Sequence, residues 1–233
     1  MFPIRDNIPA RTIPVATFGL MAVTVAVFVY QTRLSSVASA AFLYDYGAVP
    51  ARFTHPNLAA AMGFSRWSGL SLLTSVFLHG GWFHLISNMW ALWLFGDNVE
   101  DRFGRLRYTI FYLVCGIIAM GVHVVVNPQS PVPAVGASGA IAGVMGAYLI
   151  LFPKARMLVF APIFVIPYFS EIPAVLFLLA WIAIQVVSGL AESHAAVHAT
   201  QGVAFWAHVG GFFCGIVLGI LLRSVARRSY GKR

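Results

Sequence analysis

Long apolar stretches alternate with short polar connections along most of this chain. A bilayer core about 30 Å thick needs about 20 residues of helix to cross it. Six apolar segments approach or reach that length: roughly 14–30, 82–96, 105–126, 138–152, 173–190 and 205–222. Another apolar stretch, 157–168, contains Pro162 and Pro167, so we expect an interfacial or broken piece there. The pattern predicts a membrane protein with several helical spans.

The composition agrees with this interpretation. Of the 233 residues, 60% are hydrophobic and only 9% are charged, whereas soluble domains carry about 25% charged residues. A single soluble core of this length could not remove so much apolar surface from water, so the bilayer must solvate much of it. The net charge of +8 comes from short basic runs between apolar segments, which indicates membrane topology rather than nucleic-acid binding. The length favours one domain.

The basic residues also predict the orientation of the spans. Placing the N-terminus in the cytoplasm puts 12 of the 15 Lys and Arg residues inside: Arg5, Arg11, Arg102, Arg105, Arg107, Lys154, Arg156, Arg223, Arg227, Arg228, Lys232 and Arg233. The outer loops 127–137 and 191–204 then contain no Lys or Arg. The positive-inside rule therefore favours cytoplasmic N- and C-termini.

The first apolar segment has two possible interpretations. Arg11, the apolar run and Ala38-Ser39-Ala40 resemble a signal peptide with its cleavage site. The run exceeds the usual length of such a segment, and Arg33 separates it from that site, so we expect a retained helix. Residues 31–75 then form a long outer loop. Its aromatic residues suit a membrane interface: Phe42, Tyr44, Tyr46, Phe53, Phe64 and Trp67.

Polar residues inside membrane helices are costly and mark functional sites by default. His84 and Asn88 are spaced i,i+4 on one face of the second segment, Ser138 begins the fourth, and His208 lies at the start of the sixth. Ser138 lies 16 residues before Lys154, His208 lies 15 before Arg223, and His84 lies 16 before Glu100. At 1.5 Å per residue each is about 22–24 Å from these charges, so all three are predicted at one depth.

The fourth segment, 138–152, is too short to span the bilayer, and Pro131 and Pro133 oppose its extension. Its N-terminus should therefore lie within the membrane, which is tolerated only where protein or a water-filled cavity surrounds the backbone. Glycine stripes of the kind that let membrane helices approach closely occur on the fourth and sixth segments: Gly139, Gly143, Gly146, Gly211, Gly215 and Gly219. Such stripes are also common packing devices without any catalytic role.

A serine hydroxyl needs a neighbouring base to act as a nucleophile. His208 could take the proton of Ser138 and return it to a leaving amine. The Ser138 N–H, the His84 imidazole and the Asn88 amide are the candidate donors to an oxyanion. The alternatives stay open residue by residue, because a serine in a membrane helix often bonds its own backbone. His84 and Asn88 could equally bond neighbouring helices.

Other hydrolytic chemistries lack their residues. The sequence contains no H-E-x-x-H motif for a zinc protease and no pair of intramembrane aspartates. Gly136-Ala137-Ser138-Gly139-Ala140 is not the elbow of soluble hydrolases. Cys115 and Cys214 both lie in apolar segments, which predicts buried free thiols rather than a disulfide or a metal cluster.

At these residues the chain resembles the rhomboid family, over about residues 67–222. The matching motifs are His79-Gly80-Gly81-Trp82-Phe83-His84 with Asn88-Met89, the inner-loop stretch Phe95 to Gly104, Gly136-Ala137-Ser138-Gly139, and Ala207-His208-Val209-Gly210-Gly211 with Gly215. The resemblance implies an all-α membrane fold: a six-helix core over 14–222, between a cytoplasmic N-terminus (1–13) and a basic tail (223–233). It also implies an intramembrane serine protease with the catalytic dyad Ser138 and His208.

Further expectations come from the same resemblance. His84, Asn88 and the Ser138 amide would form the oxyanion hole. The residues with structural roles would be His79, Gly136, Gly139, Gly211 and Gly215. No cofactor, metal or nucleic acid is expected. Substrates would be single-pass membrane proteins cut in or beside their membrane segment. The protein would lie in a bacterial or archaeal plasma membrane, with its active site opening toward the outer side. The oligomeric state is not predicted.

Two positions depart from the family pattern. The Trp-Arg pair of the first outer loop appears as Trp67-Ser68, and an aromatic residue that stacks on the catalytic histidine in some members is replaced by Ala142. Two rival functions remain open from the sequence: a non-catalytic rhomboid-like protein that binds membrane clients, and a small transporter. Retention of both dyad residues opposes the first, and the chain shows none of the internal symmetry that would favour the second.

Overall fold

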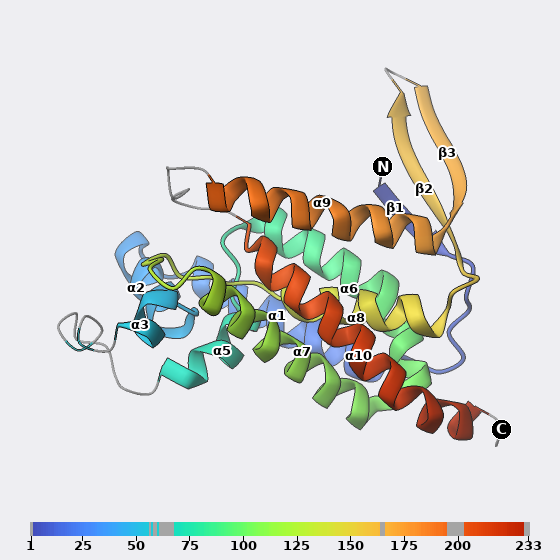
Figure 1. Ribbon diagram of the computed structural model, residues 1–233, viewed down its shortest axis with the longest axis horizontal. Helices are drawn as coiled ribbons and strands as arrows, with labels where there is room; N and C mark the ends of the chain where they lie inside the picture. Colours follow the sequence, from blue (N-terminus) through green and yellow to red (C-terminus); the bar gives the residue numbers. More distant parts are fainter. Residues whose placement is uncertain are drawn as a thin grey trace.

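The computed structural model describes residues 2–55, 57, 60, 68–163, 166–194 and 203–230. Six long helices coincide with the six predicted segments: α1 (Val15–Thr32), α6 (Trp82–Phe103), α7 (Arg105–Val126), α8 (Ser138–Leu151), α9 (Ala174–His194) and α10 (Phe205–Tyr230). They run side by side as a bundle (Figure 1). The prediction of an all-α fold is therefore confirmed in its main part, because the structure is mostly helical, although it also contains a small sheet.

Four of these helices are long and apolar enough to cross a membrane, within the part of the chain that the structure describes: α1, α7, α9 and the Phe205–Arg223 portion of α10. Helix α8 is apolar but shorter. Helix α6 runs to Phe103, farther than the predicted end near residue 96, so the stretch expected as an inner loop is helical. Its polar residues can stay in a helix because other segments bond them, as the contacts of Asn98 and Glu100 show.

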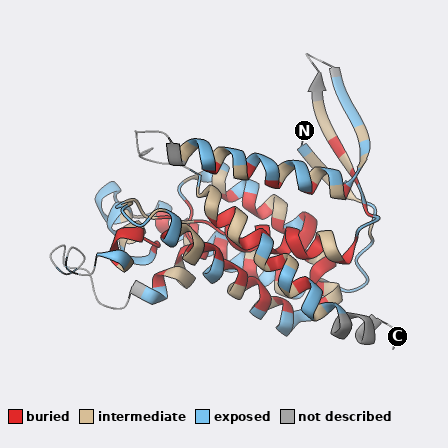
Figure 2. Ribbon diagram, viewed as in Figure 1, coloured by how far each residue is buried: buried red, intermediate tan, exposed pale blue. Residues whose placement is uncertain are grey.

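Helix α8 lies at the centre of the bundle. It packs against α10, α7, α6 and α9, and nearly all of its residues are buried, as the red ribbon in Figure 2 shows. The surrounding helices expose apolar side chains on their outer faces, among them Ile110, Ile184 and Val217. An almost entirely buried apolar helix, surrounded by helices that expose apolar side chains on their outer faces, is the arrangement expected for a protein solvated by lipid.

Helices α8 and α10 approach each other backbone to backbone. A Cβ added to Gly211 would collide with the carbonyl oxygen of Gly139, and one added to Gly215 would collide with that of Gly143. Gly139 itself faces α7, where a Cβ would lie 2.6 Å from that of Ala119. The predicted packing role of these glycine stripes is thus visible as contact distances too short for any side chain.

The structure adds a small antiparallel sheet to the helical fold. Strand β1 (Phe2–Asp6) pairs with β2 (Arg156–Ile163), which pairs with β3 (Ile166–Pro173). The apolar stretch 157–168, expected to be an interfacial or broken piece and not a span, is part of a β-hairpin that projects from the bundle (Figure 1). Antiparallel pairing satisfies the backbone of a segment that Pro162 and Pro167 exclude from a helix.

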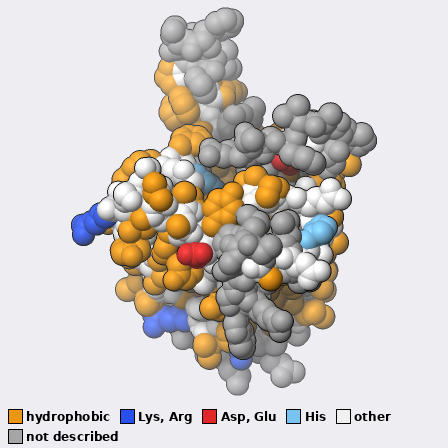
Figure 3. All heavy atoms as spheres, turned by 90° about the vertical axis from the view of Figure 1, so that its left-hand side faces the viewer, with side chains coloured by type: hydrophobic (Ala, Val, Ile, Leu, Met, Phe, Trp, Pro, Cys, Tyr) orange, Lys and Arg blue, Asp and Glu red, His pale blue; other side chains and the backbone are white. Residues whose placement is uncertain are grey.

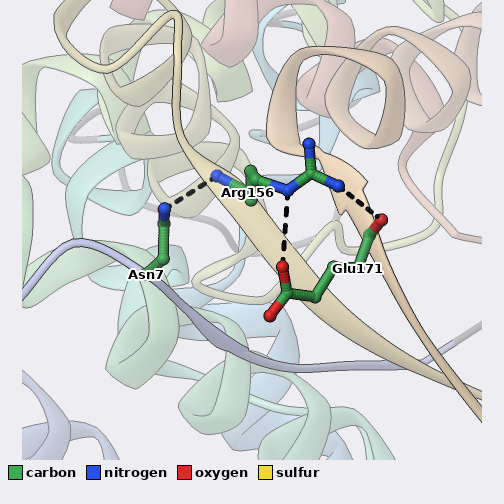
Figure 4. Close-up of polar contacts among 3 residues, drawn as sticks. All are labelled: Asn7, Arg156 and Glu171. Atoms are coloured by element: carbon green, nitrogen blue, oxygen red, sulfur yellow. Dashed lines mark hydrogen bonds and ion pairs between the residues drawn. The ribbon is translucent and has the colours of Figure 1, made fainter.

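Polar contacts join the hairpin to the N-terminal segment. The N–H of Arg156 donates to Oδ1 of Asn7 at 2.8 Å, and its guanidinium reaches the side chain and carbonyl oxygen of Glu171 at 3.4 and 3.1 Å (Figure 4). Both side chains of this ion pair are half exposed or more. Such an exposed pair contributes about 0–1 kcal/mol, so backbone pairing is the main connection between these strands.

The long connection between α1 and α6 contains several short helices. Those that the described residues define are α2 (Ser36–Tyr46), α3 (Pro50–Thr54), the 3₁₀ turn η1 (Ser68–Leu70), α5 (Ser71–Thr74) and the 3₁₀ turn η2 (Ser75–Phe77). Antiparallel pairing of Ala48 with Ala134 ties it to the segment before α8. Hydrophobic side chains cover much of the described surface at this end of the molecule (Figure 3). Of the aromatic residues predicted here, Phe64 and Trp67 lie outside the described residues.

Candidate active site

Ser138 and His208 meet at one end of the bundle. Ser138 is the first residue of α8, and His208 lies in the first turn of α10. Oγ of Ser138 is 2.7 Å from Nε2 of His208, and the histidine is 7% exposed. The close approach of α8 and α10 is what makes this distance possible, because both side chains stand at the same ends of the two helices.

A tight turn sets the direction of Ser138. Gly136 has a φ of +130°, which side-chain-bearing residues rarely adopt, and its N–H donates to the carbonyl oxygen of Ser75 at 2.9 Å. Helical bonding in α8 begins where the N–H of Ile141 donates to the carbonyl of Ala137 at 3.0 Å. The N–H groups of the preceding turn, that of Ser138 included, therefore have no acceptor within the helix.

His84 and Asn88 border the same turn. They lie one helical turn apart on α6, as their spacing predicts. A Cβ added to Gly136 would lie 2.7 Å from Nε2 of His84 and 3.7 Å from Nδ2 of Asn88. The absence of a side chain at Gly136 is thus what lets the two polar groups of α6 come up against the turn that precedes Ser138.

His79 lies behind this pair and is fully buried. Its Nε2 is 2.8 Å from Nδ2 of Asn88, its ring centroid is 4.9 Å from that of His84, and its carbonyl oxygen accepts from Nε2 of Gln31 at 2.8 Å. His79 therefore connects α1 to the polar face of α6. These contacts are of the kind that its predicted structural role requires.

The ring of His208 is contacted by two residues of α9 that the sequence-based reasoning did not select. Nδ1 of His208 is 2.7 Å from Oε1 of Gln185, and the ring centroid lies 5.6 Å from that of Trp181 at an interplanar angle of 36°. Trp181 thus supplies aromatic contact from a different helix than the one that carries Ala142. Gln185 could have been selected by the signal used for the others, a polar side chain within an apolar segment.

These contacts together define the class of protein. A hydroxyl within hydrogen-bonding distance of an imidazole, with unpaired N–H groups beside it, is the arrangement used for nucleophilic attack on a carbonyl. Here it lies in a bundle of apolar helices. The fold and site are thus those of a membrane protein with several helical spans that contains a serine–histidine pair.

Comparisons with known proteins identify the family. A family model described as the rhomboid domain matches residues 65–225, and the chain belongs to the rhomboid family. It is 33% identical over 160 residues to RHOMBOID-like protein 6, mitochondrial, of Arabidopsis thaliana, covering 69% of this chain and 45% of that protein. It is 44% identical over 78 residues to rhomboid protease GluP of Bacillus subtilis, covering 34% and 15%.

A third relative is rhomboid protein 1, mitochondrial, of Saccharomyces cerevisiae, 28% identical over 171 residues, or 71% of this chain and 45% of that protein. The chain spans less than half the length of these curated relatives. Of the pair Trp67-Ser68, where the first outer loop departs from the family pattern, Trp67 lies outside the described residues.

Proposed function

We propose that this protein is an intramembrane serine endopeptidase that cuts single-pass membrane proteins within or beside their membrane segment. The observation that carries the proposal is the 2.7 Å contact between Oγ of Ser138 and Nε2 of His208. Membership of the rhomboid family, which includes a relative named as a protease, supports it.

The proposed reaction is acyl transfer in two halves. Oγ of Ser138 attacks the scissile carbonyl carbon while Nε2 of His208 takes the hydroxyl proton, and the carbonyl oxygen becomes an oxyanion. When that intermediate collapses, the C–N bond breaks, the proton passes from His208 to the leaving amine, and an acyl-serine ester remains. A water molecule, deprotonated by His208, then attacks the ester and releases the second product with regeneration of Ser138.

The oxyanion hole is assigned to the Ser138 N–H, the His84 imidazole and the Asn88 amide. Their support is geometric, since all three border the turn at Gly136 and donors placed in advance are what oxyanion stabilisation requires. Asn88 Nδ2 also contacts His79, so one of its two amide hydrogens would serve His79 and the other would face the oxyanion.

The depth of the site follows from the length of α8. Its 14 residues correspond to about 21 Å of helix, less than the roughly 30 Å of a bilayer core. We therefore place Ser138 within the membrane, in a six-span domain over 14–222 with both termini in the cytoplasm and the site opening outward. The host membrane is proposed to be a bacterial or archaeal plasma membrane.

Cleavage of a reporter with one transmembrane segment, co-reconstituted with the purified full chain in liposomes, tests the proposal. Ser138→Ala and His208→Ala should both abolish cleavage, and Ser138→Ala should do so without lowering the midpoint of thermal unfolding. Ser87→Ala is the matched control, because Ser87 is an exposed serine whose hydroxyl bonds the His84 carbonyl, and it should cleave normally.

Mass spectrometry after treatment with a fluorophosphonate gives a second reading that needs no substrate. The modification should fall on Ser138 and disappear in His208→Ala. Cleavage by purified Ser138→Ala would overturn the assignment of the nucleophile. A wild-type protein that is neither labelled nor active would contradict the peptidase function and favour the non-catalytic, client-binding alternative.

A further inference from the structure

The imidazole of His208 has a hydrogen-bonding partner on each of its nitrogens. Nε2 faces Oγ of Ser138 from α8 at 2.7 Å, and Nδ1 faces Oε1 of Gln185 from α9 at the same distance. Both His208 and Gln185 are buried. The ring therefore bridges two helices other than its own. Rotation of the ring about χ2 would break both bonds.

The two bonds together specify one tautomer. To accept the proton of Ser138, Nε2 must carry a lone pair, so the hydrogen of the neutral ring must be on Nδ1. The amide oxygen of Gln185 accepts that hydrogen and so favours the tautomer in which Nε2 is the base. The same oxygen still accepts from Nδ1 when the imidazolium forms, so the contact is retained through proton transfer.

Gln185 belongs to a face of α9 that is turned toward α10. Trp181 precedes it by one helical turn and lies against both His208 and Phe212, with ring centroids 5.6 and 6.2 Å away. One turn after it, a Cβ added to Gly189 would lie 3.1 Å from the Trp206 ring. A glutamine inside an apolar helix is costly unless its amide is bonded, and here the bond goes to the ring of the proposed base.

We propose that Gln185 is the positioning residue for His208, and that the base is correctly oriented only while α9 is packed against α10. This inference rests on the proposed peptidase function for its catalytic consequence, although the bond itself does not. Because the acceptor comes from α9, any displacement of that helix away from α10 removes the group that holds the tautomer and the ring direction.

Substitutions that separate hydrogen bonding from packing test this role. Gln185→Met keeps the length of the side chain and removes the acceptor, whereas Gln185→Glu keeps an acceptor oxygen at the same place. Gln185→Met should lower kcat for the reporter at least about tenfold, which is 1.36 kcal/mol of barrier, with KM changed less than about twofold. Gln185→Glu should recover most of that loss. Val187→Met, on the exposed side of α9, is the matched control and should behave as wild type.

The tautomer gives a spectroscopic reading that is independent of activity. In ¹⁵N-histidine-labelled full chain in nanodiscs, the His208 signal is assigned by its loss in His208→Ala. The Nδ1–H form is expected in wild type and in Gln185→Glu, with a mixture of tautomers in Gln185→Met. If Gln185→Met does not fold, the wild-type spectrum still decides the point.

The two proposals fail in different ways. Wild-type protein that neither cleaves nor reacts with a fluorophosphonate contradicts the peptidase function, while the Nδ1–H signal would still support the Gln185 bond. An Nε2–H signal in wild type would overturn the inference about Gln185. So would equal kcat for the wild type and a folded Gln185→Met, with labelling of Ser138 intact.

Discussion

Thr17 donates both its backbone N–H and its hydroxyl to the same carboxylate oxygen of Glu100, at 2.7 and 2.8 Å. The other oxygen of Glu100 accepts the N–H of Ala16 at 2.9 Å. Helix α1 begins after Pro14 without a side-chain cap of its own, so a residue of α6 satisfies the N–H groups of its first turn. A carboxylate is favoured there because the N-terminal end of a helix carries partial positive charge.

Loss of this carboxylate should destabilise the whole bundle. Glu100→Ala leaves the buried N–H and hydroxyl of Thr17 and the partly buried N–H of Ala16 without their acceptor. Hydrogen bonds to charged groups contribute about 1.5–3 kcal/mol each, so we expect a loss of about 3 kcal/mol or more in the free energy of unfolding. Equilibrium unfolding in detergent, followed by circular dichroism, measures it. Glu171→Ala, which removes only an exposed ion pair, should cost less than about 1 kcal/mol; equal losses for the two would contradict the capping role.

The contrast between Glu100 and Ser138 shows what the sequence could predict. Ser138 and His208 stand out because each is a polar residue in an apolar segment, at a depth that residue counting estimates. Glu100 carries no such local signal, since its partner Thr17 lies 83 residues away, and the sequence-based reasoning therefore placed it in a loop. Gln185 did carry the signal, but only the packing of α9 on α10 shows that it contacts His208.

The hairpin itself could not be predicted, for a related reason. Apolar content and the two prolines excluded a regular helix over 157–168, but nothing local showed where the backbone hydrogen bonds would go. They go partly to Phe2–Asp6, more than 150 residues earlier in the chain. The helical segments were predicted well because a helix bonds within itself, whereas strand pairing depends on a distant partner.

The backbone contact between α8 and α10 makes Gly215 intolerant of a side chain. In Gly215→Ala the new Cβ meets the carbonyl oxygen of Gly143, so the two helices must separate. Overpacking of this kind costs about 1–3 kcal/mol, and we expect both a lower unfolding midpoint and slower labelling of Ser138. Gly121→Ala, on α7 with nothing within 4 Å of the added Cβ, should be neutral or stabilising by up to about 1 kcal/mol. A neutral Gly215→Ala would show that α10 is not held at this distance.

The turn before Ser138 should be equally sensitive at Gly136. An alanine there would have to keep a φ of +130°, at a cost of about 1–3 kcal/mol, and in that same backbone conformation its Cβ would lie 2.7 Å from the ring of His84. We expect Gly136→Ala to slow reporter cleavage by about tenfold or more. Fluorophosphonate labelling is measured on the same samples. Gly81→Ala is the control, because Gly81 is extended and has open space around it. Full activity in Gly136→Ala would rule out a role for the turn.

Asp6 should make the stability of the protein fall as the pH rises. Burial raises the pKa of this carboxyl above its ordinary value of 3.8, while the hydrogen bonds from the Tyr148 hydroxyl and the Ile8 N–H lower it. Between pH 3.8 and the raised pKa the native state binds more protons than the unfolded state. The contribution of Asp6 to stability is therefore complete below the pKa of its carboxyl in the unfolded state. This contribution is lost as the pH rises through the pKa of the same carboxyl in the folded state.

Asp6→Asn removes this titration. The unfolding midpoints of the wild type and of Asp6→Asn are measured in detergent over a series of pH values. The midpoint of the wild type relative to that of Asp6→Asn should be highest at low pH and should decline as the pH rises. Tyr148→Phe provides a second test, because removing a donor that lowers the pKa of Asp6 should extend the decline to higher pH. A difference between wild type and Asp6→Asn that grows with pH would mean that the bonds to Tyr148 and Ile8, and not burial, determine the pKa of Asp6.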